Sequence, residues 1–155
     1  LDEKASFKAA LKFRRCIVPA DGYYEWKTLG KKTKVPYRIS LKNNELFSFA
    51  GLWEEFEDNN GKMVHTFTII TTRANSSIMQ IHDRMPVILS SEAERKWLDN
   101  SLASEEHMQL LKPVESSKID MYTVSPMVND VNNDHPSLIK HTPAADQFGN
   151  YTLFG

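Results

Sequence analysis

The chain has 155 residues, of which 41% are hydrophobic and 25% charged, and this balance predicts one globular domain with a single buried core. No apolar run approaches the roughly 20 residues that a membrane span requires, and the first residues do not resemble a signal peptide. We therefore expect a cytoplasmic protein, or a nuclear one in a eukaryote. The single cysteine, Cys16, excludes an internal disulfide and a cysteine-rich zinc site, and its apolar neighbours indicate an inert buried thiol.

The net charge of −1 conceals two oppositely charged parts of the chain. Residues 1–42 carry 11 Lys and Arg against 4 Asp and Glu, whereas residues 43–155 carry 8 against 16. The densest basic cluster consists of Lys27, Lys31, Lys32 and Lys34. The basic part is compatible with a polyanion such as a phosphate backbone, and a solvated, mobile hairpin tip is the alternative explanation of the lysine cluster.

The first half of the chain is predicted to form one helix followed by a series of strands. Phe7, Ala10 and Leu11 recur at helical spacing, which predicts an amphipathic helix that ends near Arg14. Alternating and β-branched residues then predict strands at residues 16–19, 22–27, 35–41, 46–53 and 63–72. Strands that follow one another without helices between them indicate an antiparallel meander or a barrel-like sheet.

Individual residues predict how these strands are interrupted and joined. Pro36 is expected at a strand start or a sheet edge, because proline lacks the donor of a ladder hydrogen bond. Gly51 indicates a bulge or a close backbone approach. The acidic run at residues 54–58 and the Asn-Asn-Gly sequence at 59–61 predict the next connection, because Asn-Gly suits a tight hairpin turn.

The second half of the chain contains short helices between its strands. Asn75 or Ser76 is expected to cap one or two helical turns over residues 76–81. Ser91 and Glu94 fit a capping box for the next helix. The remaining elements are predicted as a strand at 87–89, helices at 91–98 and 105–111, and a strand at 119–124.

Together these elements predict an α+β fold with a mostly antiparallel, barrel-like β-sheet and a few short peripheral helices. We expect residues 1–140 to form the single domain. Residues 141–155 are polar and aperiodic, which predicts a loosely packed C-terminal tail.

The most unusual side chain lies in the segment that follows the Asp21-Gly22 turn. Glu25 stands between Tyr24 and Trp26, and strand alternation places Glu25 on one face and Trp26 on the other. A carboxylate on such a segment is costly unless it is exposed, paired or used in chemistry. An outward-facing strand residue and a catalytic group are both compatible with this pattern.

Histidine is the other side chain with candidate chemistry. Five histidines are scattered along the chain without metal-ligand spacing, so no metal site is expected, and neither a glycine-rich phosphate loop nor a Gly-x-Ser-x-Gly elbow is present. His82 stands in a polar turn beside Asp83 and Arg84, and imidazole side chains change charge near neutral pH. The pattern fits a general acid or base as well as a structural histidine.

Four blocks of sequence carry a resemblance that covers most of the chain. They are Arg-Cys-Ile-Val-Pro-Ala-Asp-Gly-Tyr-Tyr-Glu-Trp at 15–26, Thr-Thr-x-Ala-Asn at 71–75, Ile-His-Asp-Arg-Met-Pro-Val at 81–87 and Val-Ser-Pro-x-Val-Asn at 124–129. In this order they resemble the SOS-response-associated peptidase family, over roughly residues 7–139.

The resemblance implies a DNA-repair function in the DNA damage response. Members of the family bind single-stranded DNA and crosslink to abasic sites through an N-terminal cysteine, exposed by autoproteolytic removal of methionine, whose amine and thiol form a thiazolidine with the sugar aldehyde. At the matching positions, Glu25 would assist ring opening and proton transfer, and His82 would be the general acid at the sugar oxygen and in reversal. Trp26 would stack on a base, and Thr71 and Arg84 would lie near the DNA backbone.

The chain departs from the family pattern at its start. Residue 1 is Leu1, and the family's upstream segment with its Asn-Ala-Arg element has no counterpart in these residues. Cys16 cannot replace the nucleophile, because a thiazolidine needs the amine and the thiol of one residue, and the nitrogen of Cys16 lies in a peptide bond. We therefore expect residues 1–155 alone to lack the crosslinking activity and the strands that an N-terminal segment would add to the sheet.

The expected partner is single-stranded DNA containing abasic sites, bound by a monomer without a cofactor, a metal or a membrane. Replication partners are not indicated by the sequence. Two other functions remain compatible with the same residues. One is a non-catalytic module that binds single-stranded nucleic acid, and the other is a Glu/His-dependent hydrolase of a small molecule or a peptide.

Overall fold

The computed structural model describes residues 5–30 and 32–152, which divide into two compact units. Unit 1 comprises the described residues of Leu1–Ala20, Phe47–Arg73 and Arg84–Val114. Unit 2 comprises those of Asp21–Leu46, Ala74–Asp83 and Glu115–Gly155. Each unit is therefore assembled from three separate segments of the chain. The prediction of one domain over residues 1–140 with a tail stays a prediction.

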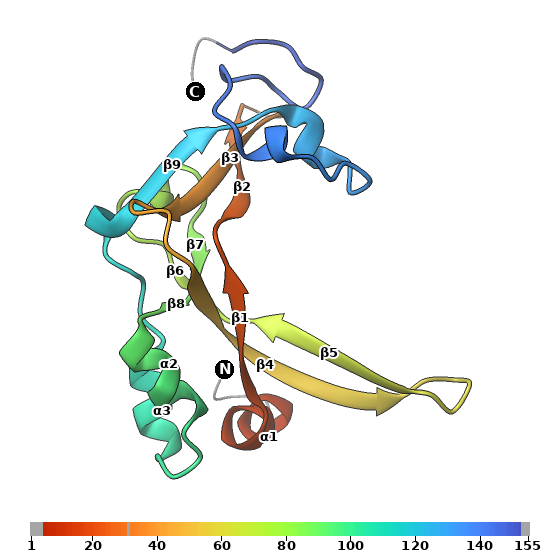
Figure 1. Ribbon diagram of the computed structural model, residues 1–155, viewed down its shortest axis with the longest axis vertical. Coiled ribbons are helices and arrows are strands. Elements are labelled where there is room, and N and C mark those ends of the chain that lie inside the picture. Colours follow the sequence, from red (N-terminus) through yellow and green to blue (C-terminus); the bar gives the residue numbers. More distant parts are fainter. Residues whose placement is uncertain (1–4, 31, 153–155) are drawn as a thin grey trace. The chain divides into compact units, whose positions relative to one another are not determined.

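The main sheet of unit 1 is built around one long strand, β4 (Phe47–Glu57). β4 pairs antiparallel with β1 (Arg15–Ala20) along its first part and with β5 (Met63–Ile69) along its second part (Figure 1). β8 (Ile88–Leu89) pairs antiparallel near the start of β4. The close backbone approach expected at Gly51 is confirmed, because a Cβ there would lie 2.8 Å from Sγ of Cys16 on β1.

The strand predicted at residues 63–72 is divided in two at Ile70. The Ile70 N–H donates to the carbonyl of Ala50 (2.9 Å), and the Ile70 carbonyl accepts from the N–H of Val87 (2.9 Å). Ile70 is buried, so the chain turns into the core before it resumes as β6 (Thr71–Arg73). β6 pairs antiparallel with β7 (Arg84–Pro86).

Helices α1 (Ala5–Phe13) and α2 (Ser91–Leu98) pack on the main sheet of unit 1, and α3 (Ser104–Leu110) follows α2. Their shared core consists of Ala10, Leu11, Ala50, Leu52, Ile70, Val87, Leu89 and Trp97. Arg15 is buried beside this core and donates to the last carbonyls of α1, including Leu11, and to the carbonyl of Trp97 in α2. One guanidinium thus satisfies the C-terminal ends of two helices.

Unit 2 contains a three-stranded antiparallel sheet in the order β2 (Tyr23–Leu29), β3 (Thr33–Leu41) and β9 (Ile119–Thr123). Its core joins Val35 and Tyr37 of β3 to Ile81, which follows the single turn η1 (Ile78–Gln80). Burial of Ile81 therefore ties the turn that carries His82 to the face of the sheet.

Pro36 lies inside the central strand β3, so its expected place at a strand start or edge is wrong. The ladder between β3 and β9 ends at the pair Tyr37–Thr123, and Pro36 lies one residue beyond it. The Pro36 carbonyl accepts from the N–H of Val124 (3.1 Å), and proline has no N–H to return a bond from this position.

Other predictions shift at element boundaries. The acidic run expected in a connection belongs to β4, which continues to Glu57 because these exposed residues pair with β5. The cap of α2 is Ser90, whose hydroxyl accepts from the N–H of Ala93, and not Ser91. The antiparallel α+β architecture with short helices is confirmed. A barrel-like closure is not confirmed, because the described strands form open ladders in three sheets.

The C-terminal part of unit 2 follows β9 with two 3-10 turns, η3 (Pro126–Asn129) and η4 (Pro136–Ile139). Beyond them, the N–H of Thr142 donates to the carbonyl of Thr123 (3.0 Å), and an isolated bridge joins Ala145 to Tyr151. The described part of the expected tail is thereby tied to the sheet. None of the helices within 5–30 and 32–152 is long and apolar enough to cross a membrane.

Candidate functional site

Glu25 lies on β2, an edge strand of the unit 2 sheet, and its side chain is half-buried. The residue opposite Trp26 is Pro36, whose carbonyl is directed to Val124, so the Trp26–Pro36 pair exchanges no ladder bonds. The outward N–H of Trp26 instead donates to Oε1 of Glu25 (3.0 Å). Oε2 of Glu25 makes no hydrogen bond with the described residues, which leaves half of the carboxylate for other partners.

The indole of Trp26 is fixed by a residue from η3. Nε1 of Trp26 donates to Oδ1 of Asn129 at 2.8 Å. Because this bond uses the only polar hydrogen of the indole, what remains for a ligand is the aromatic surface. Such a surface suits stacking on a base of single-stranded nucleic acid.

The turn that carries His82 is held at both ends. Oδ1 of Asn75 accepts from the N–H groups of Ser77 (3.1 Å) and Ile78 (3.0 Å), which confirms Asn75 as the expected capping residue. The backbone N–H of His82 donates to the carbonyl of Ile78 (2.9 Å). Nδ1 of the imidazole lies 3.2 Å from Oδ1 of Asp83, and 46% of the His82 side chain is exposed. The ring is thus oriented by a neighbouring carboxylate and accessible to a ligand.

These groups meet at one pocket, which we call the Glu25 pocket. Its volume is about 350 Å³, and it is lined by Glu25, Trp26, Thr28, Lys34, His82, Asn129 and Gln147. The pocket therefore combines a carboxylate, an imidazole, a lysine and an aromatic surface. This set can transfer protons and can attract an anion.

Lys34 reaches the Glu25 pocket from the second residue of β3, opposite Thr28. Gln147 holds this end of the hairpin, because its Oε1 accepts from the N–H of Lys34 and its Nε2 donates to the carbonyl of Lys32, both at 2.6 Å. Lys32 and Lys34 of the lysine cluster are thus bonded through their backbone groups to the C-terminal part of unit 2. Lys31 lies outside the described residues, whereas Lys27 belongs to β2.

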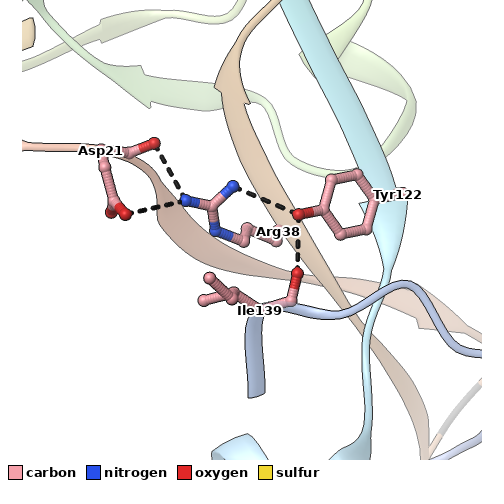
Figure 2. A network of polar contacts seen from close by, with 4 residues as sticks. All are labelled: Asp21, Arg38, Tyr122 and Ile139. Atoms are coloured by element: carbon pink, nitrogen blue, oxygen red, sulfur yellow. Dashed lines mark hydrogen bonds and ion pairs between the residues drawn. The ribbon is translucent and has the colours of Figure 1, made fainter. Parts of the chain in front are cut away.

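A second polar network sets the position where β2 begins. Figure 2 shows the buried guanidinium of Arg38 between Asp21, whose carboxylate lies 3.2 Å away, and the hydroxyl of Tyr122, also 3.2 Å away. The same guanidinium bonds the carbonyl of Asp21 (3.1 Å), and the Tyr122 hydroxyl donates to the carbonyl of Ile139 (2.8 Å). A Cβ at Gly22 would lie 2.9 Å from Cζ of Arg38, so only glycine fits this turn.

Tyr23 lies two residues before Glu25, on the same face of β2. Burial, followed by the negative charge of Glu25, raises the pKa of Tyr23 above its ordinary value of 10.0. The phenol therefore stays protonated beside the carboxylate at physiological pH.

The two predicted backbone-contacting residues lie together in unit 1. Arg84 on β7 donates through Nε to Oγ1 of Thr71 (2.9 Å) and through a terminal nitrogen to the Thr71 carbonyl (2.6 Å). Both residues are exposed, so the guanidinium is oriented while its outer edge faces solvent. The structure thus brings Glu25, Trp26 and His82 to one pocket in unit 2, and Thr71 and Arg84 to one ladder in unit 1.

Reasoning from the sequence missed Asn129 and Gln147 as pocket residues. Asn129 ends the fourth block of the resemblance, so its position was a usable signal. Gln147 lies in the segment predicted as a tail and carried no such signal. Within the described ranges, no group of three or more His, Cys, Asp or Glu side chains is arranged to hold a metal ion.

Comparison with known proteins decides the family. The sequence model of the SOS response associated peptidase (SRAP) family matches residues 1–131. The chain belongs to the SRAP family. Abasic site processing protein YoqW of Bacillus subtilis is 47% identical over 141 residues, covering 90% of this chain and 63% of YoqW. Abasic site processing protein HMCES of Rattus norvegicus is 35% identical over 178 residues, covering 92% and 50%.

A solved structure is similar to this chain in both fold and sequence. A crystal structure of a protein from Bacteroides thetaiotaomicron superimposes with a TM-score of 0.82 and 39% sequence identity, covering 90% of this chain and 62% of that protein. The chain therefore spans less than two thirds of the length of each of these relatives. The family model, matched over residues 1–131, includes all four blocks of sequence.

Proposed function

We propose that the full-length protein processes abasic sites in single-stranded DNA and becomes covalently linked to them. The observation that carries this proposal is the meeting of Glu25, Trp26 and His82 at one pocket, although they come from different blocks of sequence. The relatives named as abasic site processing proteins support the substrate class. The partner is then DNA in the single-stranded form, because Trp26 offers a stacking surface and no base-edge donor.

The covalent bond comes from an N-terminal cysteine outside residues 1–155. Its α-amine attacks the aldehyde carbon of the ring-opened sugar and loses water to form an imine. The thiol sulfur then adds to that carbon while its proton passes to nitrogen, which closes the thiazolidine. Cys16 has no part in this step, since it lies inside β1 with its nitrogen in a peptide bond, and burial raises the pKa of its thiol.

Glu25 and His82 supply the proton transfers of this sequence. Oε1 of Glu25 is held by the N–H of Trp26, so the carboxylate is oriented while Oε2 takes up or releases a proton during ring opening and imine formation. His82, oriented by Asp83, protonates the sugar oxygen and acts again when the adduct reverses. Thr71 and Arg84 contact the phosphate backbone, where the forked guanidinium binds oxygen atoms in pairs.

The test mixes the full-length protein with a labelled single-stranded oligonucleotide that contains one abasic site and separates the products on a denaturing gel. We expect a shifted band that survives denaturation and is absent with the same oligonucleotide lacking the abasic site. Without a resistant band the covalent function fails. If DNA binding in a native gel persists in that case, the protein is a non-catalytic single-stranded DNA-binding module.

A further inference from the structure

The β6–β7 ladder of unit 1 places two arginines directly opposite each other. Its register pairs Thr71 with Pro86, Thr72 with Met85 and Arg73 with Arg84. Met85 is only 1% exposed and faces the interior, whereas Arg73 and Arg84 are both exposed on the opposite face. Two arginines therefore occupy paired positions on the exposed face of one small ladder.

This arrangement is unfavourable for the protein alone. Like charges directly opposite on neighbouring strands repel, because their Cβ atoms lie only about 4.5–5.5 Å apart. In the part of the chain that the structure describes, no carboxylate forms an ion pair with Arg73. Arg84 is held in place by the hydroxyl and the carbonyl of Thr71. The ladder thus keeps two positive charges together without neutralising Arg73.

We propose that Arg73 and Arg84 together bind one phosphate group of the single-stranded DNA backbone, with Arg73 as a ligand of its own. The inference rests on the proposed function, since it names how the DNA backbone is held. A phosphate between two forked guanidinium groups receives charge-assisted hydrogen bonds from both and removes their repulsion. Arg73 occupies the open position of the Thr-Thr-x-Ala-Asn block.

The binding test uses the full-length protein and a fluorescent single-stranded oligonucleotide without an abasic site, titrated at several salt concentrations. Loss of one cationic contact to the phosphate lowers the slope of log affinity against log salt by up to about 0.7, which is at most a roughly fivefold loss of affinity at 0.1 M salt. We expect this change in Arg73→Thr and a smaller one in Arg73→Lys. Arg95→Ala is the matched control, because it removes an exposed arginine of unit 1 from α2.

The same variant should change stability in the opposite direction. Without DNA, Arg73→Thr removes the repulsion and should raise Tm by about 1–3 °C at low salt. The gain should shrink at 1 M salt, where charges are screened. A variant that merely damaged the ladder would lose both affinity and stability.

The outcomes separate this inference from the proposed function. If the parent protein binds the oligonucleotide and Arg73→Thr keeps the parental salt slope and affinity, the assignment of Arg73 is overturned. If the parent protein does not bind the oligonucleotide at any salt concentration, the proposed function fails. The arginine pair is then tested with pyrophosphate alone. Binding of pyrophosphate should raise the Tm of the parent more than that of Arg73→Thr. Equal Tm shifts in the two proteins would overturn the proposal that Arg73 and Arg84 bind one phosphate.

Discussion

In the Glu25 pocket of unit 2, bonds within the protein already orient the groups that face a ligand. Oε1 of Glu25 is held by the N–H of Trp26, the indole by Asn129, and the imidazole of His82 by Asp83. In the β6–β7 ladder of unit 1, Arg73 and Arg84 lie opposite each other, and Arg73 has no neutralising carboxylate within the described ranges. We propose chemistry on a small group for the first region and attraction of a phosphate for the second.

The two regions should affect different quantities, the Glu25 pocket the reaction rate and the β6–β7 ladder the affinity for DNA. Preorganised donors and acceptors accelerate a reaction because they need no rearrangement when charge develops. Cationic side chains that contact phosphates contribute affinity that depends on salt and is indifferent to sequence. Variants in the Glu25 pocket should therefore change rates, whereas variants in the ladder should change binding.

The largest effect is expected from Glu25 and His82, the two groups proposed to transfer protons. Glu25→Gln keeps an acceptor for the N–H of Trp26 but cannot exchange protons, and His82→Ala removes the imidazole. Each should slow formation or reversal of the abasic-site adduct by about 10²–10⁴-fold in the full-length protein. Quenched-flow samples on denaturing gels measure these rates at saturating DNA. Salt-dependent DNA binding should stay at the parental level, and parental rates would remove both residues from the mechanism.

Gly22→Ala should disturb the turn from which β2 begins. The added methyl would lie 2.9 Å from Cζ of Arg38 and 2.9 Å from the carbonyl oxygen of Ile39, which forces the buried guanidinium or the strand to move. We expect a loss of about 1–3 kcal/mol in the free energy of unfolding, measured by urea denaturation. An unchanged midpoint would show that the Arg38 network does not constrain this turn.

Asn129→Ala should release the indole of Trp26. Loss of one hydrogen bond of this kind costs about 1 kcal/mol, which corresponds to a roughly fivefold weaker stacking of DNA if the indole then samples other orientations. Fluorescence titration with single-stranded DNA measures this affinity. Asn129→Asp keeps the acceptor oxygen and serves as the matched variant. Equal losses in both variants would assign the effect to charge or folding instead of the hydrogen bond.

Some features of the two regions could be predicted from local sequence patterns, and others could not. The strand that carries Glu25 and the hydrogen bonds that Asn75 accepts at the start of its turn follow from local pattern, and the structure has both. The predicted placement of Glu25 and Trp26 on opposite faces does not separate them, because both line the Glu25 pocket. The burial of Ile81 against Val35 and Tyr37, which brings the His82 turn to the sheet, joins residues more than forty positions apart, so no local pattern contains it.

The opposition of Arg73 and Arg84 depends on register in the same way. The continuous β-type run at residues 63–72 gave no sign that Ile70 would turn inward and start a new ladder at Thr71. The position of Pro36 was predicted wrongly because it depends on where pairing with β9 ends, and β9 lies more than eighty residues later in the chain. These features arise from pairing between distant segments, whereas the elements themselves arise from local preference.

The smallest effect is expected in the dependence of stability on acidic pH. This dependence should change more in a variant beside the Glu25 pocket than in a variant of the β6–β7 ladder. Burial by itself would raise the pKa of Asp146, but hydrogen bonds from Asn150 and Phe148 outweigh it and hold this pKa below the ordinary value of 3.8. Because the folded-state pKa is the lower one, the carboxylate stabilises the fold above pH 3.8, and this contribution is lost as the pH falls through the folded-state pKa. Asp146 precedes Gln147, which holds Lys34 at the Glu25 pocket.

Asp146→Asn should therefore lower stability slightly at neutral pH and make the loss of stability below pH 4 shallower than in the parent, as measured by urea unfolding across pH. Arg73→Thr removes no carboxylate, so its stability difference from the parent should vary less over the same pH values than that of Asp146→Asn. A parental pH profile in Asp146→Asn would show that this carboxylate does not link acid to the pocket side of unit 2.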